Sequence, residues 1–270
     1  MNTKKLVISI VCSVLIATAA VAQETEIFDI ISASGKIIDK RSGKELQVGD
    51  KISFQTELEF GSLNDRAVLL NSEKAKYFLE LPKSSFVNSQ LTIASNQALS
   101  PVKNRPALIT GTRGNPTMVT NGLSPQTLKE YFKIDTFTVV GSKFTLPVTT
   151  QDARKYDLLL RYEIGIKVEE YVSTDFSIVK NDLKMEGNSI TECYVLLKEG
   201  DKTVPVTQLS IFFVEKTQLF SEFDSLLKAL NQRGNNNRTR DILIQYCTDV
   251  YGMIDRSALE TTINDFFASH

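Results

Sequence analysis

Histidine is almost missing from this sequence. The single histidine is His270, the last residue of the chain. Terminal residues are usually mobile, so we do not expect a rigid catalytic site to include it. This argues against Ser-His-Asp and Cys-His catalysis. Zinc binding is disfavoured too, because Cys193 and Cys247, the cysteines beyond the N-terminal segment, do not make up four suitable ligands.

The sequence also contains no tryptophan and has no excess of positive charge. The chain has 31 Lys and Arg against 32 Asp and Glu, which is unlike the basic excess of a nucleic-acid-binding protein. Without tryptophan, a sugar-binding cleft would need tyrosine or phenylalanine as its aromatic platform. No apolar run after the N-terminal segment approaches the length of a membrane-spanning helix. We therefore expect no nucleic-acid partner and no cofactor.

Residues 1–22 have the three parts of an export signal. Lys4 and Lys5 give a positive start, the stretch 6–17 is apolar or small, and Ala20 and Ala22 are the small residues that a signal peptidase requires. The uncharged stretch is shorter than the roughly 20 residues of a spanning helix. We expect cleavage after Ala22 and a periplasmic or secreted mature protein. The alternative is a retained membrane anchor.

The next two segments are predicted from strand and turn patterns. Residues 23–83 contain short strands with turns at Ser34-Gly35 and Ser42-Gly43-Lys44, which is typical of a small β-barrel or sandwich. One strand is predicted over 51–60, where apolar residues alternate. Residues 84–135 are interrupted by prolines and are predicted to form a connector. Within the connector we expect short strands at 91–94 and 107–110, and a helix from Pro125 to Phe132 capped by Ser124.

Residues 136–216 are predicted to form an antiparallel β-sandwich. Hairpin turns are expected at Gly141-Ser142 and at 199–202. Crossover helices, which a parallel sheet needs, are not indicated. The seven expected strands are 136–140, 143–148, 157–164, 166–172, 176–179, 190–197 and 203–214.

Residues 217–270 change to helical periodicity. Three apolar stripes predict about three helices, the last of which begins at Asp255 or at Ser257, with Ser257 and Glu260 at capping-box spacing. We expect these helices to close over a sheet; the alternative is that they form a binding groove. The predicted fold class is therefore mainly β with a helical C-terminal segment: a small N-terminal β-barrel or sandwich, then an antiparallel β-sandwich, closed by about three helices.

Three local patterns are candidate sites. Cys193 and Cys247 would form a disulfide in an oxidising compartment, or else remain as two buried thiols. Gly111, Arg113 and Gly114 would hold an anion through backbone amides and the guanidinium, or else form an ordinary glycine turn. The Ser-x-x-Lys spacing occurs at Ser177 and again at Ser225, but neither has the companion motifs of a serine hydrolase. No catalytic, cofactor-binding or metal-ligating residue is assigned.

Residues 30–82 resemble the FecR-type small β-domain of bacterial envelope proteins. The resemblance is carried by 33–37, 46–52, Gly61 and 65–69, and the sequence departs from the usual form at Asn71-Ser72-Glu73. It implies a periplasmic interaction or sensing domain without catalytic residues. The whole layout is similar to uncharacterised exported proteins of Bacteroidota.

The leading hypothesis is a non-catalytic periplasmic protein for binding, scaffolding or envelope sensing, whose partner is another envelope or periplasmic protein. The first alternative is a carboxylate-dependent hydrolase such as a carbohydrate-active enzyme, since pairs of acidic residues suffice for that chemistry. The second alternative is a membrane-tethered structural subunit, and it requires that the N-terminal signal is not cleaved.

Overall fold

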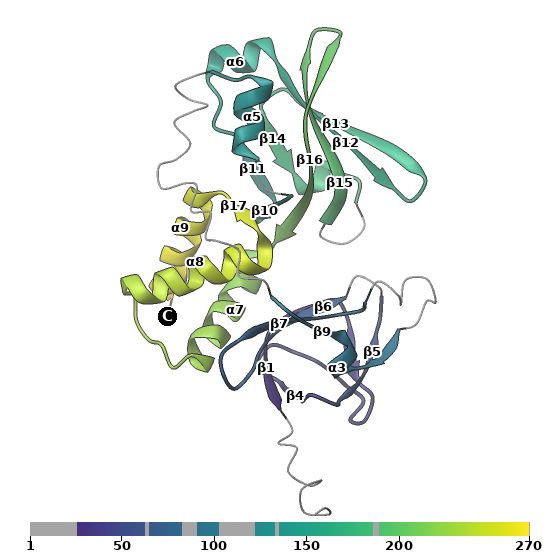
Figure 1. The fold of residues 1–270 in the computed structure, drawn as a ribbon. Coiled ribbons are helices and arrows are strands. Elements are labelled where there is room, and N and C mark those ends of the chain that lie inside the picture. Colours follow the sequence, from purple (N-terminus) through teal and green to yellow (C-terminus); the bar gives the residue numbers. More distant parts are fainter. Residues whose placement is uncertain are drawn as a thin grey trace, which may run out of the picture. The chain divides into compact units, whose positions relative to one another are not determined.

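The structure is a computed structural model that describes residues 26–62, 65–82, 91–102, 122–132, 135–185 and 189–269. It divides into two compact units, residues 1–101 and 102–270. Figure 1 shows that strands dominate and that the C-terminal part is helical. The predicted fold class, mainly β with C-terminal helices, is confirmed. The export signal at 1–22 lies outside the described residues, as do the strand expected at 107–110 and the anion site of Gly111, Arg113 and Gly114.

The first unit contains two small antiparallel sheets that share one hydrophobic core. Leu58, Leu69 and Leu79 come from both sheets and are fully buried in this core. One sheet has the order β4-β1-β6-β7-β9 and the other β3-β2-β5-β8. The elements are β1 (Ile27–Ser34), β2 (Ile37–Asp39), β3 (Lys44–Glu45), β4 (Lys51–Ser53), β5 (Glu57–Phe60), β6 (Arg66–Leu70), β7 (Lys76–Glu80), β8 (Thr92–Ala94), the short helix α3 (Ser95–Ala98) and β9 (Leu99–Pro101).

Two expectations for this region need correction. The single strand predicted over 51–60 is two strands, β4 and β5, in different sheets. A tight turn separates them, because the amide of Thr56 donates to the Ser53 carbonyl at 3.2 Å. The first unit also extends past residue 83: β8 pairs with β5 and β9 pairs with β7. The first part of the expected connector therefore belongs to this unit.

The second unit is built on a six-stranded sheet with the order β13-β12-β15-β16-β10-β17. A two-stranded sheet, β11-β14, and helix α5 supply side chains to the core that one face of the large sheet also lines. The elements are α5 (Pro125–Tyr131), β10 (Thr136–Val140), β11 (Lys143–Thr145), α6 (Thr150–Lys155), β12 (Asp157–Ile164), β13 (Lys167–Ser173), β14 (Ser177–Val179), the 3₁₀ turn η1 (Lys180–Asp182), β15 (Ser189–Glu199), β16 (Lys202–Val214), α7 (Lys216–Ala229), α8 (Asn237–Tyr251), β17 (Met253–Ile254) and α9 (Arg256–Ser269).

The sheet is not purely antiparallel, which corrects the predicted sandwich. β10 runs parallel to β16 and also to β17. The two helices α7 and α8 separate β16 from β17 along the chain and provide the long connection that a parallel neighbour requires. The expected hairpin at Gly141-Ser142 is also wrong, because β11 pairs with β14 rather than with β10. The hairpin at 199–202 is confirmed, with Glu199 opposite Lys202.

Several helices begin where a side-chain cap satisfies one of their first amides, whereas α7 has no side-chain cap. Ser124 accepts from the Thr127 amide and caps α5, as predicted, and Asn236 does the same for α8 with Thr239. Helix α9 is capped by Asp255, whose Oδ1 accepts from the Ala258 amide at 3.0 Å. Asp255, one of the two predicted starts of this helix, is therefore the cap, and the capping box expected at Ser257 and Glu260 is wrong because Ser257 lies inside the helix.

The C-terminal end of α8 packs on the sheet face opposite the main core. The Thr138 hydroxyl of β10 donates to the Tyr251 carbonyl at 2.6 Å, and the Phe212 ring of β16 lies 5.9 Å from the Tyr251 ring. The helices therefore pack on the β10 and β16 part of that face. This agrees with the prediction that they close over a sheet.

Candidate interaction surface

Strand register places a set of side chains from β13, β12 and β15 on the face of the large sheet that points away from the main core. Arg161 is opposite both Glu170 and Tyr194, and Leu159 is opposite both Val172 and Leu196. Directly opposite residues of an antiparallel pair share a face. We call this set the outer face; it comprises Leu159, Arg161, Glu163, Val168, Glu170, Val172, Tyr194 and Leu196.

Large apolar side chains of the outer face are exposed to solvent. Val168 is 60 % exposed, Val172 49 % and Tyr194 47 %. Between them, Leu159 and Leu196 are buried. Single exposed apolar residues are ordinary, but several on one face indicate a contact surface. The outer face is therefore the strongest candidate for an interaction surface in the described part of the chain.

The charged residues at the centre of the outer face are paired with each other. Glu170 accepts from Arg161 through Nε at 2.8 Å and Nη2 at 2.7 Å. Both side chains are about half exposed, so the pair adds little to stability. Its effect on the surface is greater, because the two charges compensate each other. A partner that lies on this face meets apolar side chains around a neutral pair.

The β12–β13 hairpin carries the outer face away from the rest of the second unit. Figure 1 shows these two strands extending as a separate arm. Gly165 at its tip has φ +60°, a conformation that favours glycine, and the next residue, Ile166, is fully exposed. An isoleucine in this position contributes nothing to the core of the described structure. It extends the exposed apolar surface to the end of the arm.

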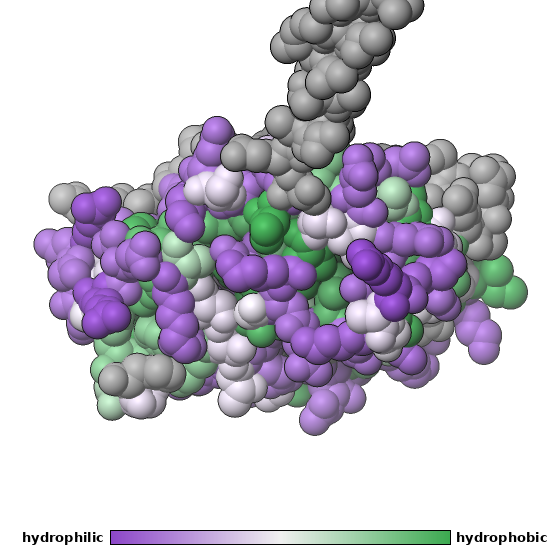
Figure 2. Space-filling model, turned by 90° about the horizontal axis from the view of Figure 1, so that it is seen from below, coloured by the Kyte–Doolittle hydropathy of each residue, from purple (hydrophilic) through white to green (hydrophobic). Residues whose placement is uncertain are grey.

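The first unit has a smaller exposed apolar region. Ile27 is 52 % exposed, and Phe54, whose ring stacks on Phe28 at 6.4 Å, is 39 % exposed. In the space-filling view, hydrophilic side chains cover most of the visible face, and apolar ones reach it in separate places (Figure 2). This region has fewer exposed apolar residues than the outer face.

A buried polar cluster lies among the C-terminal helices. Glu222 of α7 is buried, and its carboxyl group accepts hydrogen bonds from the hydroxyls of Tyr246 at 3.0 Å and Tyr251 at 2.6 Å, and from the Gln218 amide at 2.9 Å. Burial, and then the nearby Glu222, raise the pKa of Tyr246 far above its usual value. A hydrolytic carboxyl group must reach its substrate, whereas this one is enclosed by its own partners.

Two carboxyl groups nearer the surface have a lowered pKa, which is the wrong direction for a general acid. Hydrogen bonds from Ser173 and then Ser177 lower the pKa of Asp175 to about 2, and a hydrogen bond from Lys44 lowers the pKa of Asp50. A catalytic acid at neutral pH needs a raised pKa. Among the residues that the structure describes, no group of three or more His, Cys, Asp or Glu is arranged to hold a metal ion.

Neither Ser-x-x-Lys pattern forms a catalytic pair. Ser177 hydrogen-bonds through its hydroxyl to Asp175 at 2.9 Å, while the Lys180 amine binds Glu215 at 3.1 Å. In the second pattern, Lys228 binds Asp224. In both cases a carboxylate outside the pattern holds the lysine amine.

Of the two alternatives for Cys193 and Cys247, the structure has two free thiols rather than a disulfide. Cys193 of β15 and Cys247 of α8 are both buried thiols in the structure. Cys193 packs in the main core with Val195 and Leu197 of its own strand, whereas Cys247 is on a helix that packs against the opposite face of the sheet. Burial raises the pKa of the Cys193 thiol to about 12, which makes it a poor nucleophile.

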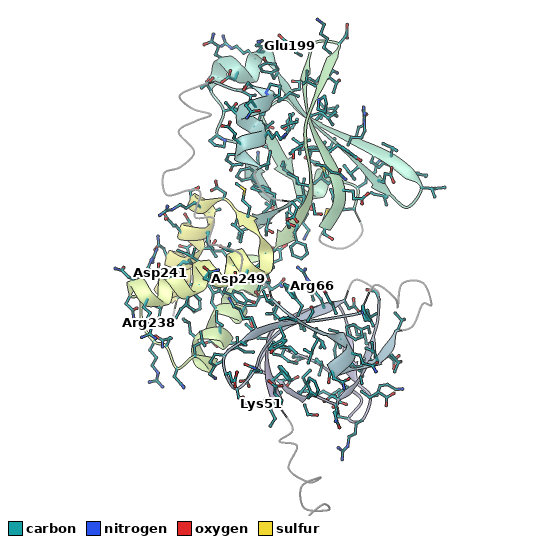
Figure 3. The ribbon with its side chains drawn as sticks, in the orientation of Figure 1. Lys51, Arg66, Glu199, Arg238, Asp241 and Asp249 are labelled. Atoms are coloured by element: carbon teal, nitrogen blue, oxygen red, sulfur yellow. The ribbon has the colours of Figure 1, made fainter. Side chains whose placement is uncertain are left out.

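Side chains of α8 and of the β15–β16 hairpin can be followed in Figure 3. Asp249 lies near the C-terminal end of α8 and accepts from Gln245 at 2.7 Å, while Arg238 and Asp241 lie near its start. Glu199 is at the hairpin tip, 3.6 Å from the Lys155 amine of α6.

Within the described residues, no helix is long and apolar enough to cross a membrane.

No protein-family model matches the chain, and neither a curated protein nor a solved structure matches it. Function is therefore inferred from the residues of this chain. The outer face was not among the sites predicted from the sequence, although both strands of its hairpin were. A usable signal was present: Val168 and Val172 are separated by an even number of residues in a strand and share a face with a charged residue, Glu170, between them.

Proposed function

We propose that this chain is an exported periplasmic protein that binds another envelope protein through the outer face and has no catalytic activity. One observation carries the proposal: Val168, Val172 and Tyr194 expose apolar surface together on one sheet face. Their central charges, Arg161 and Glu170, already neutralise each other. Such a surface favours a protein partner over a charged small molecule.

Export is supported by the sequence of residues 1–22, and an envelope role by the FecR-like pattern at residues 30–82. The absence of internal histidine and the enclosure of Glu222 by tyrosine hydroxyls argue against catalysis. The hydrolase alternative has no specific observation in its favour. The proposed mature chain begins at Gln23, and the intact mass of protein from the native host would confirm or refute this.

The proposal is tested by crosslinking and affinity capture from envelope extracts of the native host. Three forms of the mature chain are compared: the unchanged chain, the double variant Val172→Lys/Tyr194→Lys, and the control Val204→Lys. Val204 is 41 % exposed, but it lies near the far end of β16 and its register places it opposite Leu197, a core-face residue. Loss of a central anchoring side chain of an interface can cost about 2 kcal/mol or more of binding.

We expect the same captured protein with the unchanged chain and with the control, and at least a tenfold lower yield with the double variant. Equal capture by all three forms would show that the outer face is not the binding surface. If no form captures a protein reproducibly, the proposed function is wrong.

A further inference from the structure

Strand β13 forms an edge of the six-stranded sheet and is the longer of its two edges. It pairs with β12 over seven residue pairs, Leu158↔Ser173 to Ile164↔Lys167, without a shift of register. The other edge, β17, has two residues. Among the described strands, β13 has a neighbour on one side only. Its sequence contains neither proline nor glycine. An edge of this length and regularity is a template for another strand.

Natural proteins usually protect such an edge with charge. The two acidic residues of β13 are held by cations of the same unit: Glu169 by Lys184 at 2.8 Å and Glu170 by Arg161 at 2.7 Å. Arg161 contacts one carboxylate oxygen of Glu170, Oε1, and both side chains are about half exposed, so Glu170 keeps acidic character and can still accept a hydrogen bond from an incoming strand. The exposed side chains of Val168 and Val172 lie on either side of Glu170 along the same face.

A second copy of the chain does not fit this edge. The antiparallel register that places Val168 opposite Val172 also places Glu170 opposite the same residue of the other copy. Like charges directly opposite each other are unfavourable in a sheet. A strand with a basic residue at that position and β-branched residues two positions away on either side removes the conflict. The edge therefore suits a different chain.

We propose that β13 binds an extended segment of the partner protein as an added strand of the sheet. The segment presents uncharged β-branched side chains to Val168 and Val172 and a lysine or arginine to Glu170. This inference rests on the proposed function, since it names how the partner is bound. Backbone hydrogen bonds to the edge supply affinity, and the outer-face side chains supply specificity.

A synthetic peptide tests the binding mode without knowledge of the natural partner. The probe is acetyl-Thr-Val-Thr-Lys-Thr-Val-Thr-amide, which places lysine opposite Glu170 and valines opposite Val168 and Val172 in either strand direction. Two isomers are compared, one N-methylated at the two valines and the other N-methylated at the two internal threonines. Alternate amides of a strand point to the same side, so only one of the two sets faces the edge.

Binding is measured by amide NMR shifts of the mature chain. We expect shifts centred on residues 167–173 and a dissociation constant of about 1 mM. One N-methyl isomer retains this affinity and the other loses it at least tenfold. The variant Val168→Lys/Val172→Lys weakens binding at least tenfold, while Val204→Lys leaves it unchanged.

Three results would overturn the inference: equal affinity of both isomers, shifts outside β12 and β13, or no binding at about 10 mM peptide. The outcomes are distinguishable from failure of the proposed function. If envelope capture depends on the outer face but both isomers bind equally, the partner contacts side chains only, and the proposed function stands. If capture fails while one isomer binds selectively, the edge accepts strands but the proposed function is wrong.

Discussion

At the scale of single residues, the Glu222 cluster shows how a carboxyl group is accommodated inside the protein. Two tyrosine hydroxyls and one side-chain amide donate to it. A buried polar group without such partners would cost roughly 1–3 kcal/mol. The cluster thereby links α7 to α8, which supplies both tyrosines. These hydrogen bonds hold the two helices together.

The raised pKa of Tyr246 predicts a loss of stability at high pH. An unfolded tyrosine titrates near pH 10, and the folded value is higher. The folded chain therefore binds more protons above pH 10, and its stability is complete below that pH and falls as pH rises further. The variant Tyr246→Phe should lose about 1 kcal/mol at pH 7 through the missing hydrogen bond. Its stability should then fall less steeply above pH 10.

Urea unfolding at pH 7, 9, 10 and 11 measures both effects. The matched control is Tyr194→Phe, which removes the hydroxyl of an exposed tyrosine and should change neither the stability at pH 7 nor the slope. The pKa of Tyr131 is also raised, mainly by burial. Part of the loss of stability at high pH should therefore remain in the Tyr246→Phe variant. An unchanged slope for Tyr246→Phe would contradict the assignment.

At the scale of elements, the start of α8 shows how a local sequence pattern fixes a helix cap. Asn236 and Thr239 satisfy each other's backbone amides at 3.0 and 3.1 Å, which is the reciprocal arrangement of a capping box. The Thr239 hydroxyl also donates to the Gly234 carbonyl at 2.7 Å. The start of α8 is therefore determined by a few adjacent residues.

The cap of α8 gives a prediction of its own. Asn236→Ala removes the oxygen that accepts from the Thr239 amide and should lower the free energy of unfolding by about 1 kcal/mol. Asn236→Asp keeps an acceptor in the same place and serves as the control, with a loss of a few tenths of a kcal/mol or none. Chemical denaturation of the three proteins provides the comparison. Equal losses for alanine and aspartate would show that the cap does not stabilise the helix.

At the scale of the whole molecule, each of the two units has a hydrophobic core of its own. Leu58 is fully buried in the core of the first unit and Leu160 in the main core of the second. Within each unit, distant segments complete the sheets: β8 and β9 in the first, β17 in the second. Folding of each unit thus depends on pairings between strands far apart in the chain.

Separate cores predict that damage in one unit stays in that unit. Leu58→Ala and Leu160→Ala are the same substitution at equally buried sites, and each should cost about 2–5 kcal/mol. Amide hydrogen exchange should accelerate in the strands of the substituted unit and change little in the other. If either variant loses protection equally in both units, the two cores are not independent.

What the sequence determined by itself is local. Strand and turn patterns predicted the strands at 136–140 and 157–164 to the residue, and apolar stripes predicted the C-terminal helices. Only the tertiary structure decided which strands are neighbours: the parallel position of β10, the pairing of β11 with β14, and the edge position of β13. The outer face and the enclosure of Glu222 follow from those long-range choices. The physical reason is that the periodicity of apolar residues shows which side chains of a segment are buried. The order of the strands depends on contacts between residues far apart in the chain, and no local pattern encodes those contacts.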